Sequence, residues 1–187
     1  MLTPREAAAL AADELLPDEV RAPADSPRAR RLAALACGVA AKEAGYKALT
    51  QAGLQIPSGG WLHLELAPDA RRVTHLLSGV GVALRWRREG AALRCLALHA
   101  AGGTPRWGDL ADACEERAGR DASEAARELL RALIAARHPD VADPRELSVG
   151  ARGEVPVLLW RGERQPWSVS LSHAGAYVAC AYLAEAP

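Results

Sequence analysis

The chain lacks several features that would narrow its function at once. Among its 187 residues there is no Phe and only 1 Met, and its 23 Lys and Arg residues are balanced by 23 Asp and Glu residues. A chain without net charge has no broad positive field, so we expect no nucleic-acid partner. Half of the residues are apolar, which is enough to build a folded core.

Targeting and membrane segments are also missing from the sequence pattern. Residues 1–16 contain no basic region followed by an apolar stretch, and nowhere do about 18 uncharged apolar residues run together. We therefore expect a cytoplasmic protein without a membrane partner.

The cysteines and histidines form no recognisable metal or disulfide motif. The 4 cysteines contain no Cys-x-x-Cys pair, and the 5 histidines show no zinc-ligand spacing. We expect the cysteines to be reduced and mostly buried, as small hydrophobic residues. They are Cys37, Cys95, Cys114 and Cys180.

The first half of the chain predicts two helices followed by a small antiparallel sheet. Residues 3–16 begin with Thr and carry Glu three places later, which is a capping-box pattern. Residues 29–53 contain no Pro and have apolar residues at helical spacing. Residues 61–67 alternate as in a strand, and residues 80–100 predict two strands joined at Glu89–Gly90.

The second half predicts one helix followed by strands. Residues 109–138 show helical periodicity, whereas residues 146–150, 155–160 and 167–183 have the composition of strands. The order of elements indicates an α+β chain of two lobes, each with a helix packed on a small antiparallel sheet.

Both lysines of the chain lie in one short stretch, AKEAGYKAL (residues 41–49). On a helix, Glu43 and Lys47 are four apart and share one face, while Lys42 points away from them. A carboxylate beside an amine can hold a divalent cation, accept a proton or bind a phosphate oxygen. The alternative is a surface ion pair worth about 0.3–0.5 kcal/mol, which spacing alone favours.

A second stretch places polar residues between two apolar strands. In residues 168–183 one strand ends in Ser172-His173-Ala174-Gly175 and another follows at once. The exposed Ser172 and His173, with the amides of a Gly-containing turn, could cradle an anion. His173 could instead bond to the turn backbone, and no acid is placed to orient its imidazole for nucleophilic catalysis.

Together the two stretches resemble the 4′-phosphopantetheinyl transferases. AAKEAGYKAL (residues 40–49) is similar to their Lys-Glu-Ala-x-x-Lys helix, and SVSLSHAGAYVACA (residues 168–181) is similar to their Ser-x-Ser-His strand and following Val-Ala strand. The resemblance implies transfer of the phosphopantetheine arm of coenzyme A to a serine of an apo acyl or peptidyl carrier protein. Such carriers serve polyketide and nonribosomal peptide biosynthesis.

The resemblance also implies roles for particular residues. Glu43 takes the place of a metal ligand and base, Lys47 that of a phosphate contact, and Lys42 is placed with the residues that bind coenzyme A. Ser172 and His173 occupy the positions that contact its 3′-phosphate.

Further similarity extends over most of the chain, to the surfactin-type members. Residues 128–158 are similar to their first-half helix and Gly-x-Pro strand, which places Arg131 at a coenzyme A phosphate. The half that is C-terminal in the surfactin-type members comes first in this chain, and their N-terminal half comes second. This order indicates a circular permutation with residues 101–120 as the new connection. The expected lobes are residues 1–104 and 105–187. The smaller holo-acyl-carrier-protein synthases share the motif order, but the sheet at 61–100 favours the permuted arrangement.

The sequence departs from this family at the metal site. The family has a Gly-Ile/Val-Asp strand whose Asp is a principal magnesium ligand, and this strand has no counterpart after residues 176–183. Residues 79–82 have a similar Gly-Val pattern but lack the acid. Glu154 stands where a lysine is expected near the Gly-x-Pro strand. Glu43 alone makes a poor magnesium site, because hard cations need several oxygen ligands.

Three functions remain open on these residues. The first is a transferase with a depleted metal site, helped by Glu185 or by an acid of a partner. The second is an enzyme that acts on a carrier-tethered intermediate, with Glu43, Lys47 and His173 as acid or base candidates. The third is a scaffold that binds a carrier protein without catalysis. The motifs favour the first.

Overall fold

The computed structural model describes residues 27–57, 60–89, 92–100, 104, 106–117, 121–153 and 155–184. The helix expected over residues 3–16 and the acid Glu185 lie outside these ranges. The chain divides into two compact units, residues 1–105 and 106–187. In the residues that the structure describes, each unit contains one long helix and one antiparallel sheet, so the α+β fold with two lobes is confirmed.

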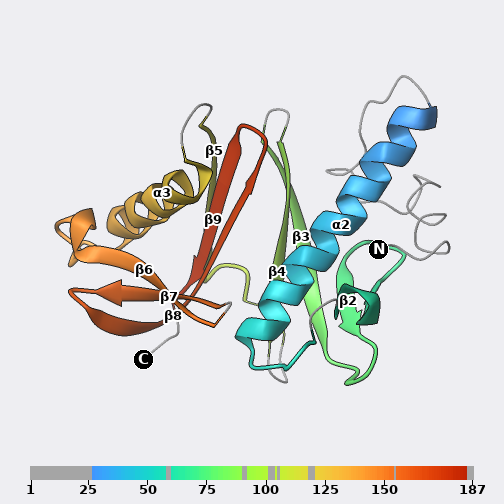
Figure 1. Cartoon of the computed structure of the whole chain (residues 1–187), viewed down its shortest axis with the longest axis horizontal. Helices are drawn as coiled ribbons and strands as arrows, with labels where there is room; N and C mark the ends of the chain where they lie inside the picture. Colours follow the sequence, from blue (N-terminus) through green and yellow to red (C-terminus); the bar gives the residue numbers. More distant parts are fainter. Residues whose placement is uncertain are drawn as a thin grey trace. The chain divides into compact units, whose positions relative to one another are not determined.

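The first unit is a helix packed on a four-stranded antiparallel sheet of order β1-β2-β3-β4. Figure 1 shows α2 running across one face of this sheet. The elements are α2 (Pro27–Gln51), the 3-10 helix η1 (Gly60–His63), β1 (Leu64–Leu66), β2 (Arg72–His75), β3 (Gly81–Glu89) and β4 (Ala92–Leu98).

The core of this unit lies between α2 and the sheet. Ala41 and Leu49 of α2 and Val73 of β2 are all fully buried there. The indole Nε1 of Trp86 donates a hydrogen bond of 2.8 Å to the carbonyl of Ala70. Gly45 lets the helix approach, because a Cβ at this position would lie 2.8 Å from Cγ1 of Val73.

The strand expected over residues 61–67 is mostly wrong. Residues Gly60–His63 form a 3-10 turn, and β1 contains only Leu64–Leu66. The alternation of the sequence is genuine, but the turn leaves Leu62 exposed rather than placing it in a sheet. Strand β2 was not expected, because its four residues are too few for a periodic signal. The two strands joined at Glu89–Gly90 are confirmed as β3 and β4, whose register pairs Glu89 with Ala92.

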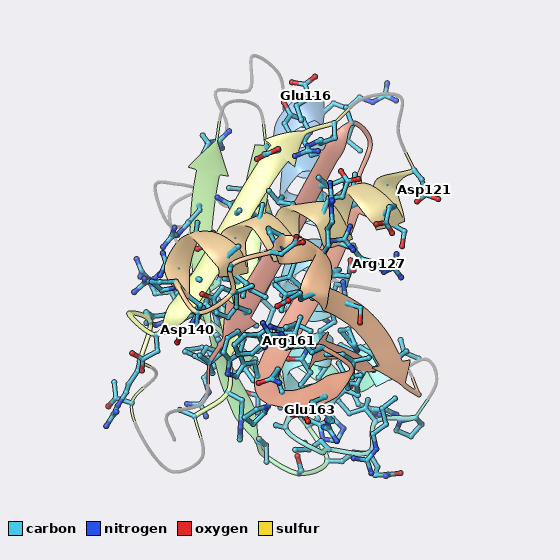
Figure 2. All side chains as sticks on the ribbon, turned by 90° about the vertical axis from the view of Figure 1, so that its left-hand side faces the viewer. Glu116, Asp121, Arg127, Asp140, Arg161 and Glu163 are labelled. Atoms are coloured by element: carbon cyan, nitrogen blue, oxygen red, sulfur yellow. The ribbon has the colours of Figure 1, made fainter. Side chains whose placement is uncertain are left out.

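The second unit is a helix packed on a five-stranded antiparallel sheet of order β5-β9-β8-β7-β6. Figure 2 looks onto this unit, with Asp121 at the start of α3 and Arg161 and Glu163 at the turn between β7 and β8. Its elements are β5 (Leu110–Glu116), α3 (Ala122–Arg137), the 3-10 helix η2 (Pro144–Glu146), β6 (Leu147–Arg152), β7 (Val155–Trp160), β8 (Glu163–Ala174) and β9 (Tyr177–Leu183).

The helix expected over residues 109–138 is wrong in its first third. Residues Leu110–Glu116 form strand β5, which pairs along its whole length with β9. Ala and Glu favour a helix locally, but the bonds to β9 and the burial of Ala111 outweigh that preference. The helix begins after Asp121, whose carboxylate Oδ1 accepts the backbone N–H groups of Ser123 (2.8 Å) and Glu124 (3.1 Å).

All four cysteines are free thiols, as the sequence predicted. Burial raises the pKa of Cys37 from 9.0 to about 11 and raises that of Cys95 further. These thiols stay protonated at neutral pH, so they act as apolar side chains. Within the described ranges, no helix is long and apolar enough to cross a membrane.

Candidate functional site

The expected pair on α2 is present in the first unit. The Nζ of Lys47 lies 2.8 Å from Oε1 of Glu43, and their side chains are 35% and 41% exposed. The sheet-facing side of α2 carries Ala41 and Leu49, so the pair lies on the outer part of the helix. An ion pair this exposed adds only a few tenths of a kcal/mol to stability, so either group can exchange its partner for a substrate at little cost.

Lys42 lies apart from this pair. Its side chain is only 2% exposed and is among the largest buried side chains of the described structure. Successive helix positions differ by about 100°, so the step from Lys42 to Glu43 turns from the packed side of α2 to its outer side. Lys42 therefore does not share the surface of Glu43 and Lys47, which makes a direct contact with coenzyme A the weakest of the predicted roles.

Ser172 and His173 lie at the exposed end of the β8–β9 hairpin in the second unit. Ala174 pairs with Tyr177, so the loop is the two residues Gly175 and Ala176. Gly175 has φ +57°, a left-handed conformation that glycine adopts without strain. The turn that the sequence predicted for Gly175 is confirmed.

The register of β8 separates the two side chains. Strand pairing continues through His173 and Ala174, and neighbouring residues of a strand point to opposite faces of the sheet. Ser172 therefore shares a face with Ser170, whereas His173 shares the face of Val169, which packs under α3. A single phosphate could contact both side chains only at the end of the hairpin, because that end is accessible from both faces of the sheet.

Arg131 already has a partner within its own unit. It lies on α3, and its Nη2 is 2.7 Å from Oε1 of Glu124. The arginine side chain is 23% exposed and the glutamate 52% exposed. The guanidinium is thus held against the helix surface by a carboxylate that a phosphate would have to displace.

The donor atoms around Glu43 do not fit a magnesium ion. Mg²⁺ requires about six oxygens at octahedral positions, normally with more than one carboxylate at or near the metal. Across the described parts of the chain, no group of three or more His, Cys, Asp or Glu side chains is arranged to hold a metal ion. The Glu43 carboxylate is instead paired with the Lys47 ammonium, which is a cation itself.

A partly buried aromatic cluster in the second unit was not expected from the sequence. The imidazole Nε2 of His138 lies 3.0 Å from the phenol oxygen of Tyr182. Trp167 is stacked on Tyr182, with a centroid distance of 5.7 Å, and lies tilted against His138, with a centroid distance of 4.4 Å. Burial raises the pKa of Tyr182, whose side chain is 3% exposed. Because His138 and Tyr182 are 44 positions apart, no local pattern could have joined them.

The three arginines of β3 are split between two faces of the first sheet. Arg85 and Arg87 lie on the face opposite α2, where Arg87 is directly across from Arg94. Arg88 shares the face of Trp86, which packs toward α2. Arg72 of β2 is directly across from Ala83, so it lies on the same face as Arg85 and Arg87.

Comparison with protein-family models, curated proteins and solved structures gives no match for this chain. The interpretation of the site therefore depends on the residues and the geometry above.

Proposed function

We propose that the protein transfers the 4′-phosphopantetheine arm of coenzyme A to a serine of an apo acyl or peptidyl carrier protein. The observation that carries this proposal is the Glu43–Lys47 contact of 2.8 Å on the outer side of α2, within a stretch that resembles the transferase helix. The fold of two lobes and the exposed Ser172 and His173 at a hairpin end are further support.

The chemistry needs one base and one cation near the pyrophosphate. The serine Oγ of the carrier attacks the phosphorus that bears the pantetheine arm, and the bond from this phosphorus to the bridging oxygen breaks. Adenosine 3′,5′-bisphosphate leaves with the bonding electrons, and Glu43 accepts the serine proton. Lys47 balances the charge that develops on the phosphoryl oxygens, a role for which a mobile ammonium is suited. No step is assigned to a metal, because the donor set does not fit one.

The test is the mass of the carrier protein. The full-length protein is incubated with coenzyme A and a panel of apo carrier proteins, in magnesium and in chelator, and each carrier is weighed by mass spectrometry. We expect the mass of one phosphopantetheine arm to be added to at least one carrier. Glu43→Gln should lower the rate about 100-fold or more, because it removes the base.

Glu163→Gln is the matched control. Glu163 is an exposed carboxylate at the β7–β8 turn, and its loss should leave the rate unchanged. No mass gain on any carrier, or equal rates for the wild type and Glu43→Gln, contradicts the proposal.

A second candidate is a diverged member that binds a carrier protein, or acts on an intermediate tethered to it, without phosphopantetheine transfer. This candidate is favoured because the described residues offer no group of three or more metal-ligating side chains, whereas the family's chemistry normally uses magnesium. It predicts binding of a holo carrier by calorimetry together with no mass gain in the transfer assay. If the carrier binds but no tethered intermediate is turned over, and Glu43→Gln leaves this binding intact, the protein is a scaffold.

A further inference from the structure

Helix α2 carries apolar residues on both of its sides. Ala34, Ala41 and Leu49 are buried against the sheet, with exposures of 4%, 0% and 0%. On the other side, Leu32, Leu35 and Val39 are exposed by 58%, 44% and 46%. A helix with apolar residues all round is normally buried on all sides, so a surface of this kind is expected to have a covering partner.

The exposed residues form one stripe with a charge at each end. Positions 32, 35 and 39 are three and four apart, so their side chains lie one above the other on the helix surface. Arg28 lies one turn before Leu32 and is exposed, and Glu43 lies one turn after Val39. Among the α2 side chains that the structure describes, Ala34 is the first that is buried, and Leu32 precedes it.

We propose that a second copy of this chain covers the stripe, with its α2 antiparallel to the first. A twofold axis beside Leu35 sets Leu35 against the partner's Ala36 and Leu32 against the partner's Val39. The same symmetry sets Arg28 against the partner's Glu43 at both ends of the contact. A parallel pair would instead oppose Arg28 to itself and Glu43 to itself, and like charges would repel.

The predicted dimer is weak, and in it Glu43 contacts both Lys47 of its own chain and Arg28 of the second copy. Three apolar side chains per copy form an interface at the small end of the known range, so we expect a dissociation constant on the order of micromolar. Because the partner's Arg28 adds a second cation beside the Glu43–Lys47 pair, dimer formation and access to this carboxylate are linked. The inference rests on the α2 surface alone and holds whether or not the proposed transfer takes place.

Sedimentation velocity of the full-length protein tests the dimer. We expect the average mass to rise with concentration toward twice the 19.8 kDa of the monomer. Leu35→Ser should weaken the dimer about tenfold or more, because it removes the central apolar contact. Leu77→Ser is the matched control, since Leu77 is a 71% exposed leucine of the same unit outside the stripe, and it should change nothing.

Charge reversal tests the antiparallel register. Arg28→Glu and Glu43→Arg should each weaken the dimer, and the double variant should restore it, because the reversed pair attracts again. Circular dichroism checks that α2 stays folded in each variant. A protein that stays monomeric at all concentrations, a dimer insensitive to Leu35→Ser, or a double variant without rescue overturns the proposal. A stripe covered by another part of the same chain would give the first of these results.

Discussion

Tyr182 shows how much the surroundings of one residue depend on distant parts of the chain. Its phenol is buried, stacked on Trp167 and within 3.0 Å of His138 Nε2. The sequence identified the exposed residues Ser172 and His173 by their position before a glycine, which is local information. It did not identify this cluster, because its three members come from α3's end, β8 and β9.

We predict that the stability of the protein falls with rising pH above pH 10 because of Tyr182. Burial raises the folded pKa of this phenol above its ordinary value of 10.0. Above pH 10 the unfolded phenol therefore loses its proton first, so unfolding releases a proton and its free energy falls as the pH rises. Below pH 10 the phenol is neutral in both states and this dependence vanishes.

The check is urea unfolding of the wild type and Tyr182→Phe from pH 8 to pH 11. The variant should be less stable by about 1 kcal/mol at pH 8, where the hydrogen bond to His138 is lost. Its further loss of stability above pH 10 should be smaller than that of the wild type. Tyr46 and Tyr177 are present in both proteins and cancel. Parallel pH curves would show that Tyr182 does not titrate differently in the two states.

At the level of a single element, the packing of helix α2 explains part of the composition of residues 41–49. Its outer side holds Glu43 and Lys47, whereas Gly45 faces β2, where Val73 leaves no space for a Cβ. The glycine is therefore explained by helix–sheet packing and the charged pair is not. This difference supports the Glu43–Lys47 pair, and not the whole of residues 41–49, as the candidate for function.

We predict that Gly45→Ala destabilises the protein although alanine is the better helix former. The added Cβ meets Cγ1 of Val73 at 2.8 Å, and Val73 is fully buried and stiff. Overpacking costs about 1–3 kcal/mol, and the gain in helix propensity is about 1 kcal/mol, so a net loss of up to about 2 kcal/mol is expected.

Denaturant unfolding measures this loss. Ala44→Gly, at the neighbouring half-buried position, supplies the effect of helix propensity alone and should cost about 1 kcal/mol. A Gly45→Ala variant as stable as the wild type, or more stable, would mean that α2 shifts away from β2 at little cost.

At the scale of the whole molecule, the described residues form two separate apolar cores. One joins α2 to the sheet β1–β4 and contains Leu49, and the other joins α3 to the sheet β5–β9 and contains Leu130. Both leucines are 0% exposed. Since a core residue stabilises the contacts around it, the stability of each unit should depend mainly on substitutions in its own core.

We predict that Leu49→Ala and Leu130→Ala each destabilise one unit. Each substitution should cost about 2–5 kcal/mol from the loss of apolar contacts and the cavity left behind. Hydrogen exchange read by mass spectrometry should show lost protection in residues 27–100 for Leu49→Ala and in residues 106–184 for Leu130→Ala. Equal loss over both units in both variants would mean that the chain unfolds as one cooperative body.

Local sequence patterns were enough to predict the features that depend on neighbours a few positions apart. The spacing of apolar residues predicted α2 and most of α3, the Glu89–Gly90 turn predicted the β3–β4 hairpin, and a separation of four placed Glu43 beside Lys47. The other features depend on contacts between residues that are far apart in the chain. Residues 110–116 are a strand because Leu110 pairs with Leu183 at the far end of the unit, and residues 60–63 turn where their alternation predicted a strand. Short segments with weak local preference take the conformation that satisfies their backbone hydrogen bonds in the assembled sheet, and those partners lie far away in the chain.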